Sequence, residues 1–275
     1  MLGRGETKSS EAEVKQTGQM ISTLKATLIS TLESGLKTVG DPYFWLTSRT
    51  ELLSLFERCP VKSGKDLLQI TKTYRGCGWY KCLEAAQVDD ELIALCDWAI
   101  RQKPRRIMEI GTAFGGTLLA WCRIASELVV SVDLPGGIHG GGYAGRRKRL
   151  YRLFTKGHST PTLHLVRQDS QKPATRQLVE DILGPSKFDI LLIDGDHRFE
   201  GVEKDYTLWR GMVQPGGFIV FHDILRHKRS RDCQVDVLWN QIKQEYPHHE
   251  IIADPEQGWA GIGIVQLASD GPTPK

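Results

Sequence analysis

Short apolar runs and longer stretches of helical spacing alternate along most of this chain. Apolar runs of this length are typical of strands that are buried on both faces of a sheet, and the stretches between them have the period of amphipathic helices. The alternation predicts a parallel sheet covered by helices on both faces. The predicted strands are residues 107–110, 128–132, 162–166, 188–193 and 218–221, and the sequence QPGG at 214–217 is predicted to form a turn before the last of them.

Upstream of the first predicted strand the pattern is helical only. Residues 1–18 contain mostly Gly, Ser, Thr, Lys and Glu, and we predict a disordered tail there. Apolar spacing predicts an amphipathic helix over 20–36 and a second helix over 48–57, in which Ser48 and Glu51 have the spacing of a capping box. The expected division of the chain is therefore a tail at 1–18, a helical cap or lid at 19–85, an α/β domain at 86–268 and a tail at 269–275.

Composition places the chain among ordinary soluble proteins. Hydrophobic residues make up 40% and charged residues 25% of the 275 positions, and no apolar run is long enough to cross a bilayer. The net charge of +3 is too small to indicate a nucleic-acid or membrane partner by itself. Six scattered cysteines and the lack of an apolar signal segment predict reduced thiols and a cytoplasmic location.

Within the sequence EIGTAFGGT, a glycine-bearing loop at 111–116 follows the first predicted strand and opens a helix. Glycines let a backbone approach a ligand closely, and the helix N-terminus presents unpaired N–H groups. The order G-x-x-x-G-G lacks the second glycine of the dinucleotide fingerprint, and Glu109 stands where a carboxylate would repel a pyrophosphate but suit a cationic ligand. Asp133 ends the second strand, 22 residues after Gly111, where a carboxylate can bind two ribose hydroxyls. These features predict a nucleoside site and disfavour NAD.

Polar residues also follow the fourth and fifth predicted strands. The sequence DGDH, residues 194–197, comes after the fourth strand, and His222 and Asp223 end the fifth. Since the carboxyl ends of parallel strands meet at one edge of a sheet, these side chains should share a crevice with Glu109 and Asp133.

The sequence blocks in this region resemble those of the cephalosporin-hydroxylase-like branch of the class I S-adenosylmethionine-dependent methyltransferases. The resemblance runs from about residue 79 to residue 266 and is carried by EIGTAFGGT, SVDLPGG, HGGGYAGRRKRLYRLF, RQDS, LLIDGDHRFEGVEKDY, QPGGFIVFHD and GWAGIGIV. It implies an α/β, Rossmann-like fold with a seven-stranded, mostly parallel sheet, closed by an antiparallel hairpin at 249–252 and 260–265. It also implies that S-adenosylmethionine is the cofactor.

The same resemblance assigns candidate cofactor residues. It places Glu109 near the methionine moiety, Asp133 at the ribose, and Asp169 and Ser170 at the adenine. The full set is Glu109, Gly111, Thr112, Ala113, Gly115, Gly116, Thr117, Asp133, Asp169, Ser170 and Asp194.

The implied activity is methylation of a hydroxyl on a small molecule of the sugar or natural-product type, with Asp194, His197 and His222 as candidate catalytic residues. A histidine can act as the base, or a divalent metal such as Mg²⁺ or Mn²⁺ can lower the pKa of the acceptor hydroxyl. Related catechol-type enzymes hold magnesium at positions that match Asp194, His222 and Asp223. His222 departs from that pattern, because magnesium prefers oxygen ligands. If no histidine acts chemically, Asp194 and Asp223 orient the donor or cap a helix.

The rival functions are an NAD-dependent oxidoreductase and a non-catalytic partner protein that binds the cofactor.

Two basic runs follow carboxyl strand ends, and we call them the basic rim. They are either solvated surface or a surface that recruits an anionic acceptor. The runs are Arg146, Arg147, Lys148, Arg149 and Arg152 and then Arg226, His227, Lys228, Arg229 and Arg231. Three further hypotheses concern a substrate-closing loop at 136–145, an acceptor pocket containing Trp79 and Tyr80, and a homo-oligomer that packs through the helix at 20–36.

Overall fold

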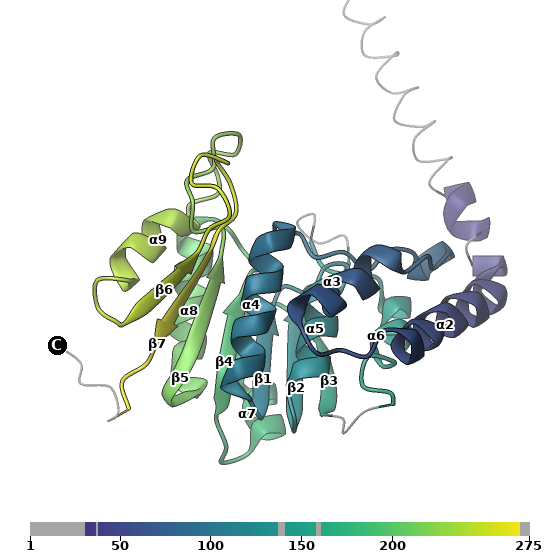
Figure 1. The fold of residues 1–275 in the computed structure, drawn as a ribbon, viewed down its shortest axis with the longest axis horizontal. Helices are drawn as coiled ribbons and strands as arrows, with labels where there is room; N and C mark the ends of the chain where they lie inside the picture. Colours follow the sequence, from purple (N-terminus) through teal and green to yellow (C-terminus); the bar gives the residue numbers. More distant parts are fainter. Residues whose placement is uncertain (1–30, 37, 137–140, 158–160, 270–275) are drawn as a thin grey trace, which may run out of the picture.

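A seven-stranded sheet lies between two layers of helices in the computed structural model, which describes residues 31–36, 38–136, 141–157 and 161–269 (Figure 1). The strand order across the sheet is β3-β2-β1-β4-β5-β7-β6. In chain order the elements are α2 (Asp41–Arg58), α3 (Gly64–Thr73), η1 (Gly78–Tyr80), α4 (Asp89–Gln102), β1 (Arg106–Ile110), α5 (Gly116–Ile124), β2 (Leu128–Asp133), η2 (Gly145–Arg147), α6 (Lys148–Tyr151), β3 (Thr162–Arg167), α7 (Pro173–Leu183), β4 (Phe188–Ile193), α8 (Phe199–Trp209), η3 (Arg210–Met212), β5 (Val213–His222), α9 (Val235–Ile242), β6 (His248–Ile251) and β7 (Ile262–Gln266).

The first five strands are parallel and the last two form the predicted hairpin. Strand β1 lies between β2 and β4, with Met108 opposite Val130 and Leu191, and β7 pairs antiparallel with both β5 and β6. The five strands predicted from the apolar runs and the two of the predicted hairpin are all present. Strand β4 has the predicted bounds, and β1, β2 and β3 differ from theirs by one residue.

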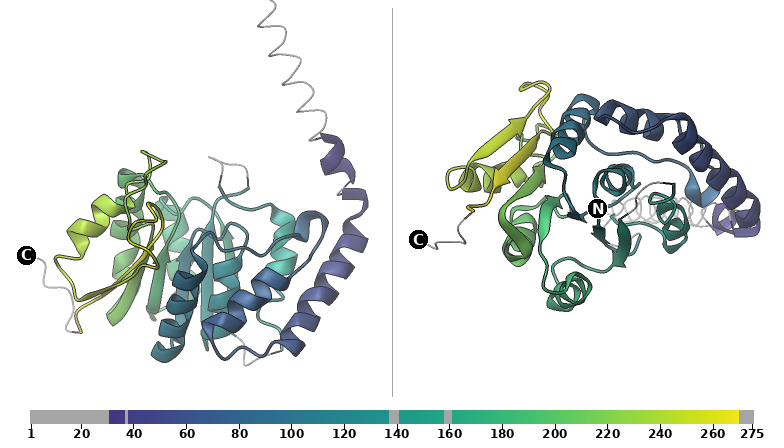
Figure 2. Two further views of the ribbon diagram at one scale, coloured as in Figure 1. Left: turned by 45° about the horizontal axis from the view of Figure 1, so that its top comes forward. Right: turned by 60° about the horizontal axis from the view of Figure 1, so that its bottom comes forward.

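Both faces of the central strands β1, β2 and β4 are buried, which explains why these strands are continuous apolar runs. Ile107 packs with residues of α4 and α5, whereas its neighbour Met108 packs with residues of α7, α8 and α9, and neither side chain is exposed to solvent. The two helical layers are visible on either side of the sheet in Figure 2.

The prediction for the second helix was wrong at its start. Helix α2 begins at Asp41, so Ser48 lies inside it, is fully buried and accepts a hydrogen bond from the backbone N–H of Cys77 at 3.0 Å. The capping box is found instead at α3, where Ser63 and Asp66 each accept a hydrogen bond from the other's backbone N–H. The predicted QPGG turn was also wrong, because residues 214–217 belong to β5, beside a register irregularity in β4 between Phe188 and Ile190.

Several predictions lie wholly or mostly outside the described residues. They are the disordered tail at 1–18, the helix at 20–36 and the tail at 269–275, and residues 137–140 of the predicted substrate-closing loop at 136–145 also lie outside them. In the described part of that helix Leu32 and Leu36 are exposed, and packing against a second copy stays a prediction. All six cysteines are described and free, and no helix among the described residues has the length and hydropathy needed to span a membrane.

Candidate active site

The glycine loop joins β1 to α5 by a backbone path that L-residues rarely follow. Gly111, Ala113 and Gly115 have φ angles of +92°, +43° and +85°. A Cβ atom placed on Gly111 would lie 1.9 Å from the carbonyl oxygen of Asp194. Glycine is therefore required at this position, because the loop packs directly on the segment that follows β4.

Asp133 holds the glycine loop from the end of β2. Its Oδ2 accepts hydrogen bonds from the backbone N–H groups of Thr112 and Ala113 at 3.0 and 2.9 Å, and its Oδ1 accepts one from Leu134 at 2.8 Å. Burial raises the pKa of Asp133, although these three N–H groups act in the opposite direction. The carboxylate therefore shapes the loop, and its predicted contact with a ribose stays a prediction.

Glu109 lies beneath the same loop and is completely buried. Its Oε2 accepts a hydrogen bond from the hydroxyl of Thr117 at 3.1 Å, and its Oε1 has no hydrogen-bond partner among the described residues. Burial raises the pKa of Glu109 to about 8. This position supports the loop from below, and a direct contact between Glu109 and the methionine moiety stays a prediction.

The predicted adenine loop is fixed to α8. The Ser170 hydroxyl donates to Oδ1 of Asp205 at 2.7 Å, and Oδ1 of Asp169 accepts from the backbone N–H of Gln171 at 2.8 Å. Asp205 is fully buried, and burial raises its pKa to about 7. A contact of this loop with adenine is not tested by these distances.

The structure brings the polar residues after β4 and β5 together, as the sequence predicted. Oδ1 of Asp194 lies 3.4 Å from Nε2 of His197 and 3.2 Å from Nδ1 of His222. Oδ2 of Asp223 lies 3.1 Å from Nδ1 of His197. We call Asp194, His197, His222 and Asp223 the histidine–carboxylate cluster. His197 is the most open member, with 42% of its side chain exposed against 4% for His222 and for Asp223.

Charges within the cluster balance one another. The hydrogen bond with Asp194 is the main reason that the pKa of His197 is raised, to about 11. Burial alone would lower the pKa of His222, but the charge of Asp194 raises it. Burial alone would raise the pKa of Asp194, but the charge of His222 lowers it.

The donor set of the cluster fits a divalent metal. Ligand atoms of Asp194, His222 and Asp223 lie within 4.8 Å of one another. Neither ring nitrogen of the buried His222 has an aligned hydrogen bond among the described residues, despite the 3.2 Å contact of Nδ1 with Asp194. A buried imidazole without hydrogen bonds is costly, and carboxylate oxygens with imidazole nitrogens are ordinary ligands for Mn²⁺, Fe²⁺ or Zn²⁺.

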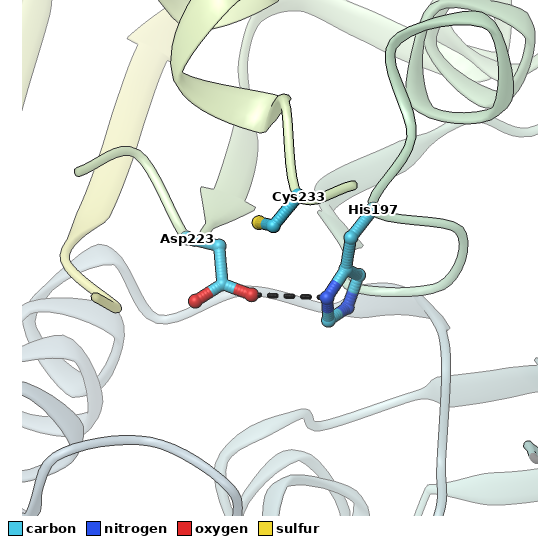
Figure 3. Close-up of side chains that lie close together, drawn as sticks. All are labelled: His197, Asp223 and Cys233. Carbon is cyan, nitrogen blue, oxygen red and sulfur yellow. Dashed lines mark ion pairs between the residues drawn. The ribbon is translucent and has the colours of Figure 1, made fainter. Parts of the chain in front are cut away.

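Three residues of this site were not predicted. The Gln87 side chain, in the segment before α4, donates to Oδ2 of Asp194 at 2.7 Å. His227 was expected in the basic rim, but its Nε2 lies 2.9 Å from Oδ1 of Asp223. Cys233 belongs to a second group of candidate ligands with His197 and Asp223 (Figure 3). No local pattern marks these positions, because long-range contacts bring them to the site.

The basic rim is only partly a surface feature. Arg147 is buried and donates hydrogen bonds to the carbonyl oxygens of Trp79, Lys81, Cys82 and Phe114, so its assignment to the rim was wrong. Arg149 pairs with Asp41 at 3.0 Å. The exposed cations that remain are Arg146, Arg152, Arg226, Lys228, Arg229 and Arg231.

The aromatic pair of the predicted acceptor pocket is divided in the structure. Tyr80 is fully buried and its hydroxyl donates to Asp41 at 2.9 Å, so it is part of the core and does not line an acceptor pocket. Trp79 is half-buried, and the guanidinium of Arg146 lies 5.6 Å from the centre of its ring. Trp79 alone stays a candidate for acceptor contact.

Residues 108–224 match a family model described as a methyltransferase domain. Among curated proteins, an uncharacterised protein of Acanthamoeba polyphaga mimivirus is 49% identical over 126 residues, which is 45% of this chain and 53% of that protein. An uncharacterised protein of Sinorhizobium fredii is 28% identical over 127 residues, 44% of this chain and 13% of that protein. The chain thus spans about half the length of the first relative and much less of the second.

Solved structures share the fold at low sequence identity. An O-methyltransferase from Bacillus cereus, crystallised with S-adenosylhomocysteine, has a TM-score of 0.50 and 15% identity, over 78% of this chain and 96% of that one. A Staphylococcus aureus structure with the provisional name caffeoyl-CoA O-methyltransferase has a TM-score of 0.51 and 16% identity, over 80% and 99%. These similarities confirm the predicted Rossmann-like methyltransferase fold.

Proposed function

We propose that the protein is a class I S-adenosylmethionine-dependent methyltransferase and transfers a methyl group from S-adenosylmethionine to a hydroxyl of a small molecule. The class was predicted from the sequence, and the match of residues 108–224 to a methyltransferase domain and the shared fold support it. The cephalosporin-hydroxylase-like branch stays a prediction.

One observation carries the proposal. The glycine loop, Asp133 and the histidine–carboxylate cluster all lie at the carboxyl ends of neighbouring strands, and the loop touches the cluster where Gly111 packs on Asp194. Open α/β sheets bind ligands at this edge. A donor held by the loop would therefore lie beside groups that can orient an acceptor and receive its proton.

Methyl transfer from a sulfonium is an in-line displacement, so the protein mainly aligns the donor with the acceptor oxygen. In our proposal the glycine loop positions the methyl donor. Asp194, which accepts a hydrogen bond from Gln87, positions the acceptor in the histidine–carboxylate cluster. His197 is the histidine that reaches the surface, and with its pKa raised to about 11 it would orient the acceptor by donating a hydrogen bond from a ring nitrogen instead of taking the acceptor proton.

Asp194, His222 and Asp223 would hold a divalent cation. When bound, such a cation lowers the pKa of an acceptor hydroxyl. The orphaned nitrogens of His222 favour this arrangement over a histidine base that works without metal.

Exposed cations beside the site support an anionic acceptor, of the phosphorylated, carboxylated or sulfated class. Arg226, Arg229 and Arg231 lie in the segment after β5, whose backbone is bonded to the β6–β7 loop through Leu225 and Lys228. These two loops rise together at one end of the sheet in Figure 1. Attraction of this kind weakens as salt screens it.

Calorimetric titration of the protein with S-adenosylhomocysteine and, separately, with NAD tests the cofactor. We expect S-adenosylhomocysteine to bind and NAD not to bind. Binding of NAD alone would favour the oxidoreductase, and binding of neither would overturn the proposed donor site.

Transfer of a labelled methyl group tests the reaction. We expect label to appear on hydroxyl acceptors, with turnover lost in EDTA and restored by a divalent cation, and with anionic acceptors losing affinity between low and physiological salt. Cofactor binding without transfer to any acceptor would favour the non-catalytic partner protein.

A further inference from the structure

Cys233 adds a thiol to the candidate metal ligands of the cluster, a ligand type that the magnesium site of the catechol-type enzymes does not contain. Its thiol lies with His197 and Asp223 in a group whose ligand atoms are all within 4.8 Å of one another. The three side chains converge from three different segments, after β4, after β5 and before α9 (Figure 3).

The position of Cys233 is fixed by its neighbours. The backbone N–H of Gln234 donates to the carbonyl oxygen of His197 at 2.8 Å, and the side-chain oxygen of Gln234 accepts from the N–H of Phe199 at 3.4 Å. Cys233 itself is 8% exposed and packs in the core on the α7–α9 side of the sheet. The thiol is therefore held beside His197 by backbone contacts and is not a freely moving surface group.

The two candidate ligand groups share one residue. Asp223 directs Oδ2 to His197, at 3.1 Å, and Oδ1 toward His222, at 3.5 Å. Ligand atoms bound to one Zn²⁺ at ~2.0–2.3 Å lie at most about 4.6 Å apart. The ligand atoms of this group all lie within 4.8 Å of one another, so small side-chain rotations suffice to bring them to one cation.

The chemistry of these ligands decides which cation they favour. Magnesium requires oxygen ligands in an octahedral arrangement, and a thiolate with imidazole offers it little. Thiolate, imidazole and carboxylate together are ligands of Zn²⁺ and of the later first-row cations. The buried His222, 4% exposed, lies in the neighbouring ligand group and directs a nitrogen without a hydrogen bond toward Asp194, so imidazole ligands that favour these cations over Mg²⁺ are present on both sides of Asp223.

We propose that His197, Asp223 and Cys233 bind a thiophilic divalent cation of the Zn²⁺ class at the edge of the histidine–carboxylate cluster, with the Cys233 thiolate as the ligand that excludes Mg²⁺. The inference rests on the proposed function only in placing this metal centre inside the methyltransferase site. Binding of the cation releases the thiol proton to solvent and forms a metal–sulfur bond, with no change of oxidation state.

Titration of the full-length protein with Co²⁺ tests the assignment, because cobalt replaces zinc in such sites and its bond to a thiolate gives a charge-transfer band in the near ultraviolet. We expect saturable binding with this band, displacement by Zn²⁺ and no displacement by Mg²⁺ in excess. Loss of an outer-shell partner weakens metal binding about 10- to 100-fold, so loss of a direct ligand in Cys233→Ser should cost at least as much and abolish the band.

Two controls make the result specific. Cys59→Ser changes a half-buried cysteine at the end of α2 that belongs to neither ligand group, and it should keep the band and the affinity. Cys233→Asp should still bind a cation but lose the band, which separates a lost ligand from a lost fold.

Cobalt binding without a thiolate band, or a band that survives in Cys233→Ser, would overturn the role of Cys233. Absence of any Co²⁺ binding would overturn the site. Titration of each variant with S-adenosylhomocysteine is independent of these results, so a failed metal site and a failed methyltransferase assignment give different outcomes.

Discussion

Asp133 contributes to the site through the backbone of the glycine loop. Two N–H groups of the loop donate to one of its oxygens, at 3.0 and 2.9 Å. Asp133→Asn leaves the shape but removes the charge, and hydrogen bonds to charged groups contribute about 1.5–3 kcal/mol. We predict a fall in affinity for S-adenosylhomocysteine of about 10- to 100-fold, measured by calorimetry.

Asp189 offers a matched control for this change. Its Oδ2 also accepts two backbone N–H groups, from Arg105 and Arg106 at 2.8 and 2.7 Å, but at the amino end of β1. Asp189→Asn should lower stability and leave cofactor affinity unchanged. Equal losses of affinity in both variants would mean that Asp133 acts through general stability.

Glu109 should make the stability of the protein depend on pH. Its carboxyl has an ordinary pKa of 4.5 in the unfolded chain and a pKa of about 8 in the folded protein, because it is buried. The native state then binds more protons than the unfolded state between these values, so its contribution to stability is complete below pH 4.5 and is lost as pH rises toward 8.

We therefore predict that Glu109→Gln flattens the decline of unfolding free energy between pH 5 and 8, as measured by urea denaturation. Asp205, with a pKa raised to about 7, adds to the same decline, and Asp205→Asn should remove a separate part of it that ends at lower pH. A profile for Glu109→Gln that runs parallel to that of the unaltered protein would show that Glu109 is ionised in the native state.

At the scale of elements, the contact between the β1–α5 loop and the segment after β4 is the closest in the site. In Gly111→Ala the new Cβ would lie 1.9 Å from the Asp194 carbonyl oxygen, at a φ of +92°. The two segments must separate, and we predict a loss of stability above about 3 kcal/mol together with loss of cofactor binding.

Gly184→Ala is the matched control for backbone strain alone. Gly184 also has a positive φ, +62°, but a Cβ there would meet nothing within 4 Å. Gly184→Ala should lower the free energy of unfolding by only about 1–2 kcal/mol and leave cofactor binding intact. If Gly111→Ala behaves like Gly184→Ala in thermal unfolding and in calorimetry, the loop and the β4 segment are not tightly coupled.

Arg147 joins the helical region to the same loop. One guanidinium donates to carbonyl oxygens of Lys81 and Cys82 on one side and of Phe114 on the other, at 2.7 to 2.9 Å. Lysine cannot reproduce this planar fork, so Arg147→Lys leaves buried carbonyls without donors. We predict a loss of about 2–4 kcal/mol in chemical denaturation and weaker cofactor binding.

Arg149→Lys provides the comparison, because Arg149 is 45% exposed and no carbonyl among the described residues depends on it: it forms an ion pair with Asp41, donates to the Tyr80 hydroxyl at 3.3 Å and lies over the Trp45 ring at 4.4 Å. Such pairs contribute about 0–1 kcal/mol, so a much smaller effect is expected. Similar losses of stability in the two variants would contradict the proposal that Arg147 joins the helical region to the glycine loop.

What the sequence could predict at this scale follows from how each element is stabilised. Strands buried on both faces must be apolar throughout, so their positions were visible in the sequence. The first part of α2 was not, because its residues are held by distant partners: Trp45 packs on Tyr80 with ring centres 5.3 Å apart, and Asp41 binds the Tyr80 hydroxyl. Tertiary contacts of this kind override local signals.

The same distinction applies to the candidate site. Asp194, His222 and Asp223 were predicted to meet because parallel strands end at one edge. Gln87 and Cys233 come from segments whose paths depend on long-range contacts, so no spacing marks them. Arg147 stands in a run of charges that is typical of surface, and only the structure shows that it is buried.

At the scale of the whole molecule, the helical region and the α/β domain share one core. Leu52 and Leu55 of α2 and Ile70 of α3 are buried in the same cluster as Ile107 of β1 and Leu118 of α5. The boundary predicted at residue 85 is thus a change of sequence pattern within continuous packing. A separate lid would be expected to have apolar contacts of its own and a smaller interface with the sheet.

We predict that the protein unfolds in one cooperative transition. Tryptophans lie both in the helical region, at Trp45 and Trp79, and in the α/β domain, at Trp121, so fluorescence and circular dichroism report on both parts. Their thermal midpoints should coincide, and the calorimetric enthalpy should equal the van't Hoff enthalpy. Leu52→Ala, which opens a cavity in the shared core, should shift the whole transition by about 2–5 kcal/mol in unfolding free energy. Two transitions, with only the first shifted by Leu52→Ala, would show that residues 41–85 fold as a separate unit and would support the lid over the cap.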